Sequence, residues 1–288
     1  MSDITLQWLK TAVLYEISAS EFTGIPEDEA SRRLENLTAL GVDTLLLKDV
    51  GSDPALIPSG AAEKGLRCVV GLTGGFADPA AIKMQIRQLT AAGAAGFACM
   101  ENAADRETIA AVSQMIREEF PETAFIVRKS APAADTGSDI GNLTAALTSP
   151  GIAIIQSGDE IGIRAPGSSS LWETAEAMKD VENSLWQRAG LLIRFRRRLS
   201  ALRSDAPAEV IKNGDPLICC RGSEDQKILI VIRKENQPWQ CRLPMPEVRG
   251  ICPLTGTWIR ADFPEDGIIF SGEGTECGVF LILRTLKN

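Results

Sequence analysis

Short apolar segments alternate with amphipathic segments through the first two thirds of the chain, and this alternation limits the fold more than any other feature. Strand-like apolar runs occur at residues 12–17, 43–47, 66–72, 93–101, 123–127 and 152–155. Near-continuous apolar runs are typical of strands that are buried on both faces. Segments with helical spacing separate them, so strands recur at roughly 25-residue intervals. The alternation predicts a parallel α/β sheet, either a barrel or an open sheet.

Several of the intervening helices have recognisable ends. Pro26 is followed by three acidic residues, which suit the positive end of a helix dipole, and Gly41 ends that helix. A second helix, Ala80 to Ala92, ends at Gly93. Further helices are predicted at 55–64, 105–120, 142–149 and 171–204. The arginines at the end of the last segment are typical of a helix C-terminus, with a phosphate site as the alternative.

The character of the chain changes after Pro207. Short β-rich runs at 217–220, 227–233, 239–243, 257–261 and 278–284 are separated by turns rich in Gly, Asn and Asp, and no helical period remains. This pattern predicts an antiparallel β domain of about 80 residues, most simply a small sandwich. We therefore expect two domains, residues 1–204 and 205–288.

Charge and hydropathy exclude several classes of function. Acidic residues outnumber basic ones by 38 to 30, giving a net charge of −8, which argues against a nucleic-acid or anionic-membrane surface. No apolar run approaches the ~18 residues that span a bilayer. The N-terminal residues lack the basic start and apolar core of a secretory signal, so we expect a cytoplasmic protein without a membrane partner.

The chain contains no histidine and seven cysteines. The absence of histidine removes the commonest general base, the Ser-His and Cys-His nucleophiles and every His-ligated metal site. We predict no cofactor and no metal. The cysteines form no C-x-x-C pair and lie mostly in apolar runs, which favours buried thiols over a disulfide in the C-terminal third.

Several segments in the correct order resemble the α-amylase family of glycoside hydrolases. Residues 93–101, Gly-Ala-Ala-Gly-Phe-Ala-Cys-Met-Glu, resemble the family's fourth strand, G-V-D-G-F-R-x-D. Residues 40–47 resemble its second strand, L-G-V-D-A-I-W-L, and residues 150–162 its eighth strand, P-G-T-P-F-I-Y-Q-G-D-E-I-G. Similar matches cover the first strand at 12–22, the helix at 192–203 and the end of the C-terminal β domain at 253–257 and 278–283.

The resemblance implies a shortened TIM-like (β/α) barrel followed by a β-sandwich. The span from Lys129 to Asn142 leaves no room for two of the family's strand–helix units, so we expect about six barrel strands instead of eight. Removing two units leaves either a re-closed barrel or an open sheet. An open edge beside 125–127 and 152–155 would expose apolar strands, which predicts a homodimer.

The residues that carry the family's chemistry are missing. The resemblance places the nucleophile at Met100, its neighbouring arginine at Ala98, and the acid/base glutamate at Lys129. Retaining glycosidases need two carboxyl groups about 5–5.5 Å apart, and neither position supplies one. We therefore predict a pseudoenzyme, retained as a binding or assembly module with an α-glucan or small sugar as its partner.

The alternative is a diverged glycoside hydrolase or transglycosylase with a rebuilt carboxylate pair. Carboxylates at the expected strand ends are Glu16, Asp49, Glu101, Asp159 and Glu160. Of these, only Asp49 and Glu101 are candidates for a new catalytic pair. Tyr15, the only tyrosine, is a candidate for stacking on a sugar and equally for the core. Residues 72–76, Leu-Thr-Gly-Gly-Phe, are a further candidate, for anion binding through backbone N–H groups, although they lack the pattern of a phosphate loop.

Overall fold

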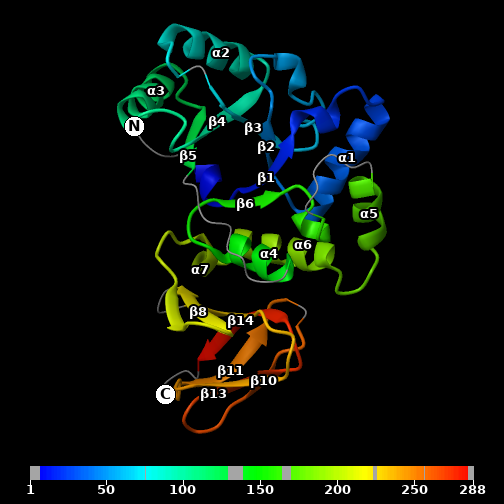
Figure 1. Cartoon of the computed structure of the whole chain (residues 1–288), viewed down its shortest axis with the longest axis vertical. Helices are drawn as coiled ribbons and strands as arrows, with labels where there is room; N and C mark the ends of the chain where they lie inside the picture. Colours follow the sequence, from blue (N-terminus) through cyan, green and yellow to red (C-terminus); the bar gives the residue numbers. More distant parts are fainter. Residues whose placement is uncertain are drawn as a thin grey trace. The chain divides into compact units, whose positions relative to one another are not determined.

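The computed structural model describes residues 7–74, 76–128, 139–163, 170–222, 226–255 and 257–284. The chain divides into two compact units. The first contains residues up to 132 together with 154–158 and 163–176, and the second contains 133–153, 159–162 and the residues from 177 onwards. Figure 1 shows a parallel sheet with helices in the first unit and antiparallel sheets in the second.

Six parallel strands form the sheet of the first unit, and their order is β5-β4-β3-β2-β1-β6. Their bounds are β1 (Val13–Ser18), β2 (Thr44–Lys48), β3 (Arg67–Gly71), β4 (Ala94–Met100), β5 (Ala124–Arg128) and β6 (Ala153–Gln156). This confirms the predicted reduced barrel of six strands. β6 lies next to β1, which is where the eighth strand of a closed barrel lies, as the resemblance of residues 150–162 implies. Within the described residues, β5 pairs with β4 alone.

The central strands are buried on both faces, as their continuous apolar sequences predict. Val13, Leu14 and Tyr15 of β1 are 0% exposed, and the residues from 44 to 47 of β2 are at most 1% exposed. Gly96 allows β5 to approach β4 closely, because a Cβ there would lie 2.9 Å from the Cβ of Ala124.

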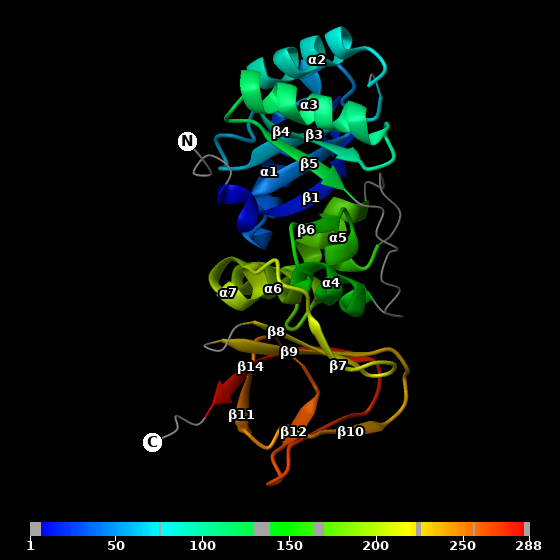
Figure 2. The same ribbon diagram turned by 90° about the vertical axis from the view of Figure 1, so that its left-hand side faces the viewer.

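Three helices of the first unit have the ends that their sequences predict. α1 (Glu27–Leu40) ends at Gly41, whose φ of 102° is left-handed. α2 (Pro79–Ala91) and α3 (Arg106–Glu119) are each capped by an aspartate. These two helices lie side by side (Figure 2), and Lys83 of α2 contacts Glu119 of α3 at 2.6 Å.

The predicted helix at 55–64 was wrong. This segment forms only a 3₁₀ turn, η3 (Pro54–Leu56), followed by turns, because Pro58 and Gly60 interrupt the helical spacing. Three other 3₁₀ turns connect the elements: η1 (Gln7–Lys10), η2 (Ala19–Phe22) and η4 (Asp159–Ile161).

The continuous helix predicted for 171–204 is three helices: α5 (Ser170–Met178), α6 (Leu185–Arg198) and α7 (Ser200–Arg203). Two local features separate them. Asn183 has a φ of 58°, and Ser184 begins α6 by accepting a hydrogen bond from the backbone of Gln187. Leu199 is extended and divides α6 from α7. α4 (Asp139–Thr148) is the helix predicted at 142–149.

Two antiparallel sheets form the β part of the second unit. One has the order β11-β14-β9-β8-β7, with β7 (Glu209–Lys212), β8 (Leu217–Gly222), β9 (Lys227–Arg233), β11 (Val248–Pro253) and β14 (Glu276–Arg284). The other has the order β10-β13-β12, with β10 (Trp239–Leu243), β12 (Arg260–Asp262) and β13 (Ile268–Gly272). A single apolar cluster, which includes Phe270 and Phe280, lies between them.

Three of these strands, β7, β11 and β13, were not predicted. β7 and β11 are edge strands with many exposed residues and a break in register, so they lack an apolar alternation. α4 contacts the five-stranded sheet through β9 and β14, and α7 contacts β8. The second unit therefore has helices, a five-stranded sheet and a three-stranded sheet in successive layers (Figure 2). The predicted domain boundary between residues 204 and 205 stays a prediction.

Arg196 joins helices of this unit, and no ion pair among the described residues gives it an acidic partner. Its guanidinium donates to the carbonyls of Leu147 at 2.8 Å, Ser149 at 2.9 Å and Gly151, and the residue is 1% exposed. Carbonyls in the last turn of α4 and just after it are thereby satisfied. Burial, together with the nearby Arg221, lowers the pKa of Arg196 to about 10, so it stays charged at neutral pH.

Arg196→Met is expected to lower the free energy of unfolding by about 2–4 kcal/mol, because it leaves three backbone carbonyls without their donor. Urea denaturation followed by circular dichroism measures the change. The control is Arg194→Met on the same helix, because Arg194 is exposed. Equal stability of the two variants would contradict the capping role of Arg196.

Candidate functional site

The candidate site lies at the carboxyl ends of the parallel strands, where α/β sheets place their binding and catalytic groups. The polar and sulfur-containing residues at these ends include Glu16 and Ser18 of β1, Lys48 of β2 and Asp49 after it, Met100 and Glu101 at the end of β4, Arg128 of β5, and Gln156 of β6 and Ser157 after it.

Glu16 and Arg128 form a two-pronged ion pair at these strand ends. Nη1 of Arg128 donates to Oε1 of Glu16 at 2.8 Å, and Nη2 donates to Oε2 at 3.1 Å. The Glu16 side chain is 9% exposed and that of Arg128 is 22% exposed. Both oxygens of this carboxylate are therefore occupied by a guanidinium, which is the strongest common pairing for a carboxylate.

This ion pair requires the sheet to be strongly curved. β5 and β1 are separated by three strands in the sheet order. At the usual strand spacing, four steps across a flat sheet measure about 19 Å, which is further than extended Arg and Glu side chains can bridge. The contact exists because the sheet curls into a half-barrel, which brings the ends of β5 and β1 toward each other.

Met100, the predicted nucleophile position, is the last residue of β4. In the parallel register it lies opposite Arg128 of β5. In the family that the sequence resembles, these two strands carry the catalytic carboxyl groups. Here the paired residues are an uncharged Met100 and a positively charged Arg128. Ala98 is 2% exposed. Lys129, the predicted acid/base position, lies outside the described residues.

Asp49 and Glu101 make separate contacts. Asp49 is exposed and its Oδ2 accepts a hydrogen bond from Oγ of Ser18 at 3.1 Å. Glu101 lines a cavity of about 590 Å³ with Arg106 and Ile109 of α3 and with Val127. β3 lies between the strands that precede them, so their backbones are separated by about 10 Å at the usual strand spacing. Among the described residues, no contact brings these two carboxylates together.

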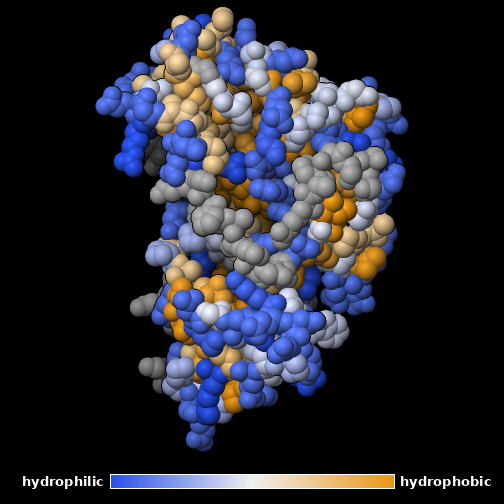
Figure 3. All heavy atoms as spheres, in the orientation of Figure 1, coloured by the Kyte–Doolittle hydropathy of each residue, from blue (hydrophilic) through white to orange (hydrophobic). Residues whose placement is uncertain are grey.

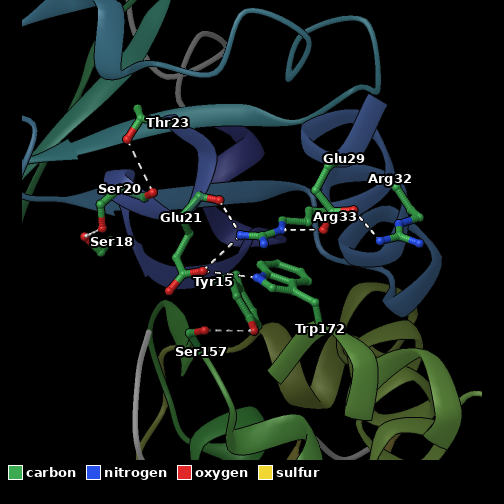
Figure 4. A network of polar contacts seen from close by, with 10 residues as sticks. All are labelled: Tyr15, Ser18, Ser20, Glu21, Thr23, Glu29, Arg32, Arg33, Ser157 and Trp172. Atoms are coloured by element: carbon green, nitrogen blue, oxygen red, sulfur yellow. Dashed lines mark hydrogen bonds and ion pairs between the residues drawn. The ribbon is translucent and has the colours of Figure 1, made fainter. Parts of the chain in front are cut away.

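Tyr15 is buried in the core and not available for stacking. It is 0% exposed, and its hydroxyl lies 3.4 Å from Oγ of Ser157, which follows β6 (Figure 4). Asp159 and Glu160 belong to η4, and Glu160 is 2% exposed. These two carboxylates belong to the second unit.

Trp172 of α5 anchors a second network beside β1, which Figure 4 shows. Its Nε1 donates to Oε2 of Glu21 at 3.1 Å, and its ring packs against Phe22 with centroids 6.3 Å apart. The guanidinium of Arg33 lies 5.1 Å from the Trp172 ring and also pairs with Glu21 at 3.1 Å. The polar groups of η2 are therefore bonded within the chain.

Sequence reasoning missed both the Glu16–Arg128 pair and the Trp172 anchor. A signal for the first was present, since two opposite charges end otherwise apolar strands of one parallel sheet. Nothing in the sequence pointed to Trp172, because its segment was predicted as the start of one long helix, 171–204, and not as a separate helix beside β1.

Among the described residues, no group of three potential metal ligands is close enough to hold an ion. No helix in the described part of the chain is long and apolar enough to cross a membrane.

Comparison with solved structures identifies the fold. Similar structures include isomaltulose synthase from Erwinia rhapontici NX5 in complex with sucrose, with a TM-score of 0.74, 10% identity and coverage of 96% of this chain and 99% of that chain. Trehalose-6-phosphate hydrolase from Bacillus licheniformis has a TM-score of 0.73 and 11% identity over 96% of this chain and 100% of its own. A trehalulose synthase has a TM-score of 0.71 and 11% identity over 96% and 100%.

No family model matches the sequence, and a search of curated proteins finds no match. The likeness therefore rests on the backbone, which is retained although about nine residues in ten differ. The chain has the fold of the α-amylase family of glycoside hydrolases. This confirms the family resemblance that the strand sequences indicated.

Proposed function

We propose that this chain is a non-catalytic binding module on an α-amylase-type fold, derived from an enzyme that acted on α-glucosides. The observation that carries the proposal is the Glu16–Arg128 ion pair at the strand ends. A sugar or an α-glucan is the proposed partner. The similar enzymes support this choice, since one was solved with sucrose and another with glucose.

The chemistry of retaining glycosidases explains why this ion pair matters. One carboxylate must attack the anomeric carbon, and a second carboxyl group must donate a proton to the leaving group. Met100 has no charge, and both oxygens of Glu16 already accept hydrogen bonds from Arg128. A carboxylate whose two oxygens already accept hydrogen bonds from a guanidinium is poorly placed to attack an anomeric carbon.

The competing function is a diverged hydrolase or transglycosylase that uses Asp49 and Glu101. The exposure of both carboxylates favours it, since each is accessible to a substrate. Their position on strands separated by β3 opposes it, because a retaining pair is only about 5–5.5 Å apart. We therefore place this function second.

The purified chain is expected to release no reducing sugar from sucrose, trehalose, isomaltose, maltooligosaccharides or starch above the level of buffer. Loss of one catalytic carboxylate commonly removes several orders of magnitude in rate, and here neither predicted position carries one. The measurement is a coupled glucose assay with long incubation, made on the wild type, Asp49→Asn and Glu101→Gln.

The matched control is Glu107→Gln, which removes another exposed carboxylate at the start of α3. Turnover that is present in the wild type and in Glu107→Gln, but absent in Glu101→Gln or Asp49→Asn, would contradict the non-catalytic proposal. It would support the rebuilt carboxylate pair instead.

We also retain the homodimer as a proposal, with the edge of β5 as its contact. In the described residues β5 pairs with β4 alone, and Val127 is 43% exposed. Ile126 and Ile155 are buried within the chain, so unpaired backbone rather than a wide apolar face would drive association. Figure 3 shows the mixture of pale orange and blue atoms on the surface over α2 and α3.

Light scattering is expected to give twice the chain mass of 31.0 kDa, and Val127→Lys is expected to shift the protein to the monomer. Met84→Lys is the control, because Met84 is 59% exposed on α2 and lies away from the β5 edge. A wild-type protein that stays monomeric at micromolar concentration would exclude the dimer.

The redox state of the seven cysteines is relevant to the cellular compartment of the protein. All are free thiols, and five of them are buried. Free thiols are typical of a reducing compartment, which supports our proposal of a cytoplasmic location.

A further inference from the structure

The outer face of the three-stranded sheet carries a row of polar side chains that the core does not use. Burial alternates along β10, so Trp239, Cys241 and Leu243 face the apolar cluster, while Gln240 and Arg242 are exposed. In the antiparallel register Gln240 lies opposite Ser271 of β13, and Ser271 lies opposite Arg260 of β12. These three side chains therefore form one row across the sheet.

An exposed tryptophan precedes Arg260 of this row by two residues in the chain. Trp258 is 80% exposed, although its neighbour Ile259 is buried in the cluster at 7% exposed. Trp258, the polar row and Glu273 line a cavity of about 690 Å³. The Trp258 ring is exposed to water, whereas tryptophan rings are usually buried. A ligand that covers the ring removes this apolar surface from water, and this burial favours binding.

The polar side chains of this cavity have no intramolecular partner. Within the described part of the chain, no hydrogen bond or ion pair engages the side chains of Gln240, Arg260, Ser271 or Glu273. Arg242 differs, because it lies on the same face and pairs with Asp266. The cavity thus holds a guanidinium, an amide, a hydroxyl and a carboxylate that are free to bind a ligand.

A buried polar group, the indole N–H of Trp239, also belongs to a residue that lines the cavity. Trp239 lines it and is 9% exposed, and its Nε1 has no hydrogen-bond partner in the described structure. Gly272 permits this arrangement, because a Cβ at that position would lie 2.8 Å from Nε1 of Trp239. A buried donor without a partner is uncommon and calls for an explanation such as a ligand or a water.

We propose that this cavity is a binding site for a pyranose-containing oligosaccharide. One face of a pyranose ring presents C–H groups that pack on an aromatic ring, and its edge presents hydroxyl groups. Trp258 supplies the ring, and the planar side chains of Gln240, Arg260 and Glu273 supply donors and acceptors in pairs. The site takes a neutral sugar, because a positive and a negative side chain stand in it together.

A proline-rich peptide is the competing occupant, because exposed tryptophans also bind such peptides. Grooves that bind polyproline are lined by several aromatic rings, whereas this cavity has one exposed ring among four free polar side chains. The composition therefore favours the sugar. This inference goes beyond the proposed function, since it concerns the three-stranded sheet and holds whether or not the strand ends of the first unit catalyse a reaction.

Titration of the full-length protein with maltohexaose, cellohexaose and xylohexaose, followed by calorimetry and tryptophan fluorescence, tests the proposal. We expect at least one of them to bind, and Trp258→Ala to weaken that binding by about tenfold or more, as for an aromatic anchor. Arg260→Ala is expected to weaken it in the same direction. Arg242→Ala is the matched control on the same face and is expected to bind as the wild type does.

A pull-down with granular starch and with cellulose tests whether the site binds an insoluble polysaccharide or only soluble oligosaccharides. Retention of the wild type that is lost in Trp258→Ala would support binding to the polysaccharide. Unchanged thermal stability of Trp258→Ala is expected because the ring is exposed. Absence of binding by all three sugars and both polymers would overturn the proposal. So would sugar binding that Trp258→Ala leaves unchanged, or Trp258-dependent binding of a decaproline peptide alone.

Discussion

The Glu16–Arg128 ion pair is the interaction on which the architecture of the first unit depends. It links β5, at one edge of the parallel sheet, to β1, which is separated from β5 by three strands. Only a curled sheet permits this contact, and the contact in turn opposes flattening of the sheet. Among the described residues, β5 and β6 do not pair, so the sheet lacks the hydrogen bonds that close an eight-stranded barrel. The Glu16–Arg128 pair supplies part of the constraint that such closure would give.

The same ion pair connects structure to function. The strand ends of an α/β barrel are the usual place for catalytic carboxyl groups. Here the carboxylate of Glu16 at the strand ends forms an ion pair with the guanidinium of Arg128, and Met100 lies opposite Arg128 in the strand register. The second unit shows a related use of charge, because Arg196 satisfies backbone carbonyls at the C-terminal end of α4 and has no ion-pair partner in the described residues. Charged groups in both units thus stabilise the fold.

Sequence alone predicted the parallel sheet because its strands are buried on both faces and read as continuous apolar runs. It also predicted that residues 150–162 correspond to the last barrel strand, and β6 lies beside β1 as this requires. The Glu16–Arg128 contact could not be predicted, since it depends on the curvature of the whole sheet and joins residues 112 positions apart. The edge strands β7 and β11 were missed because exposed edges carry no apolar alternation.

A double-mutant cycle tests the central claim most directly. The free energies of unfolding of the wild type, Glu16→Gln, Arg128→Met and the double variant give the coupling between the two side chains. We predict a coupling free energy of about 1–3 kcal/mol, with the double variant more stable than the sum of the single losses implies. A coupling below about 0.5 kcal/mol, as for an exposed surface pair, would contradict the account.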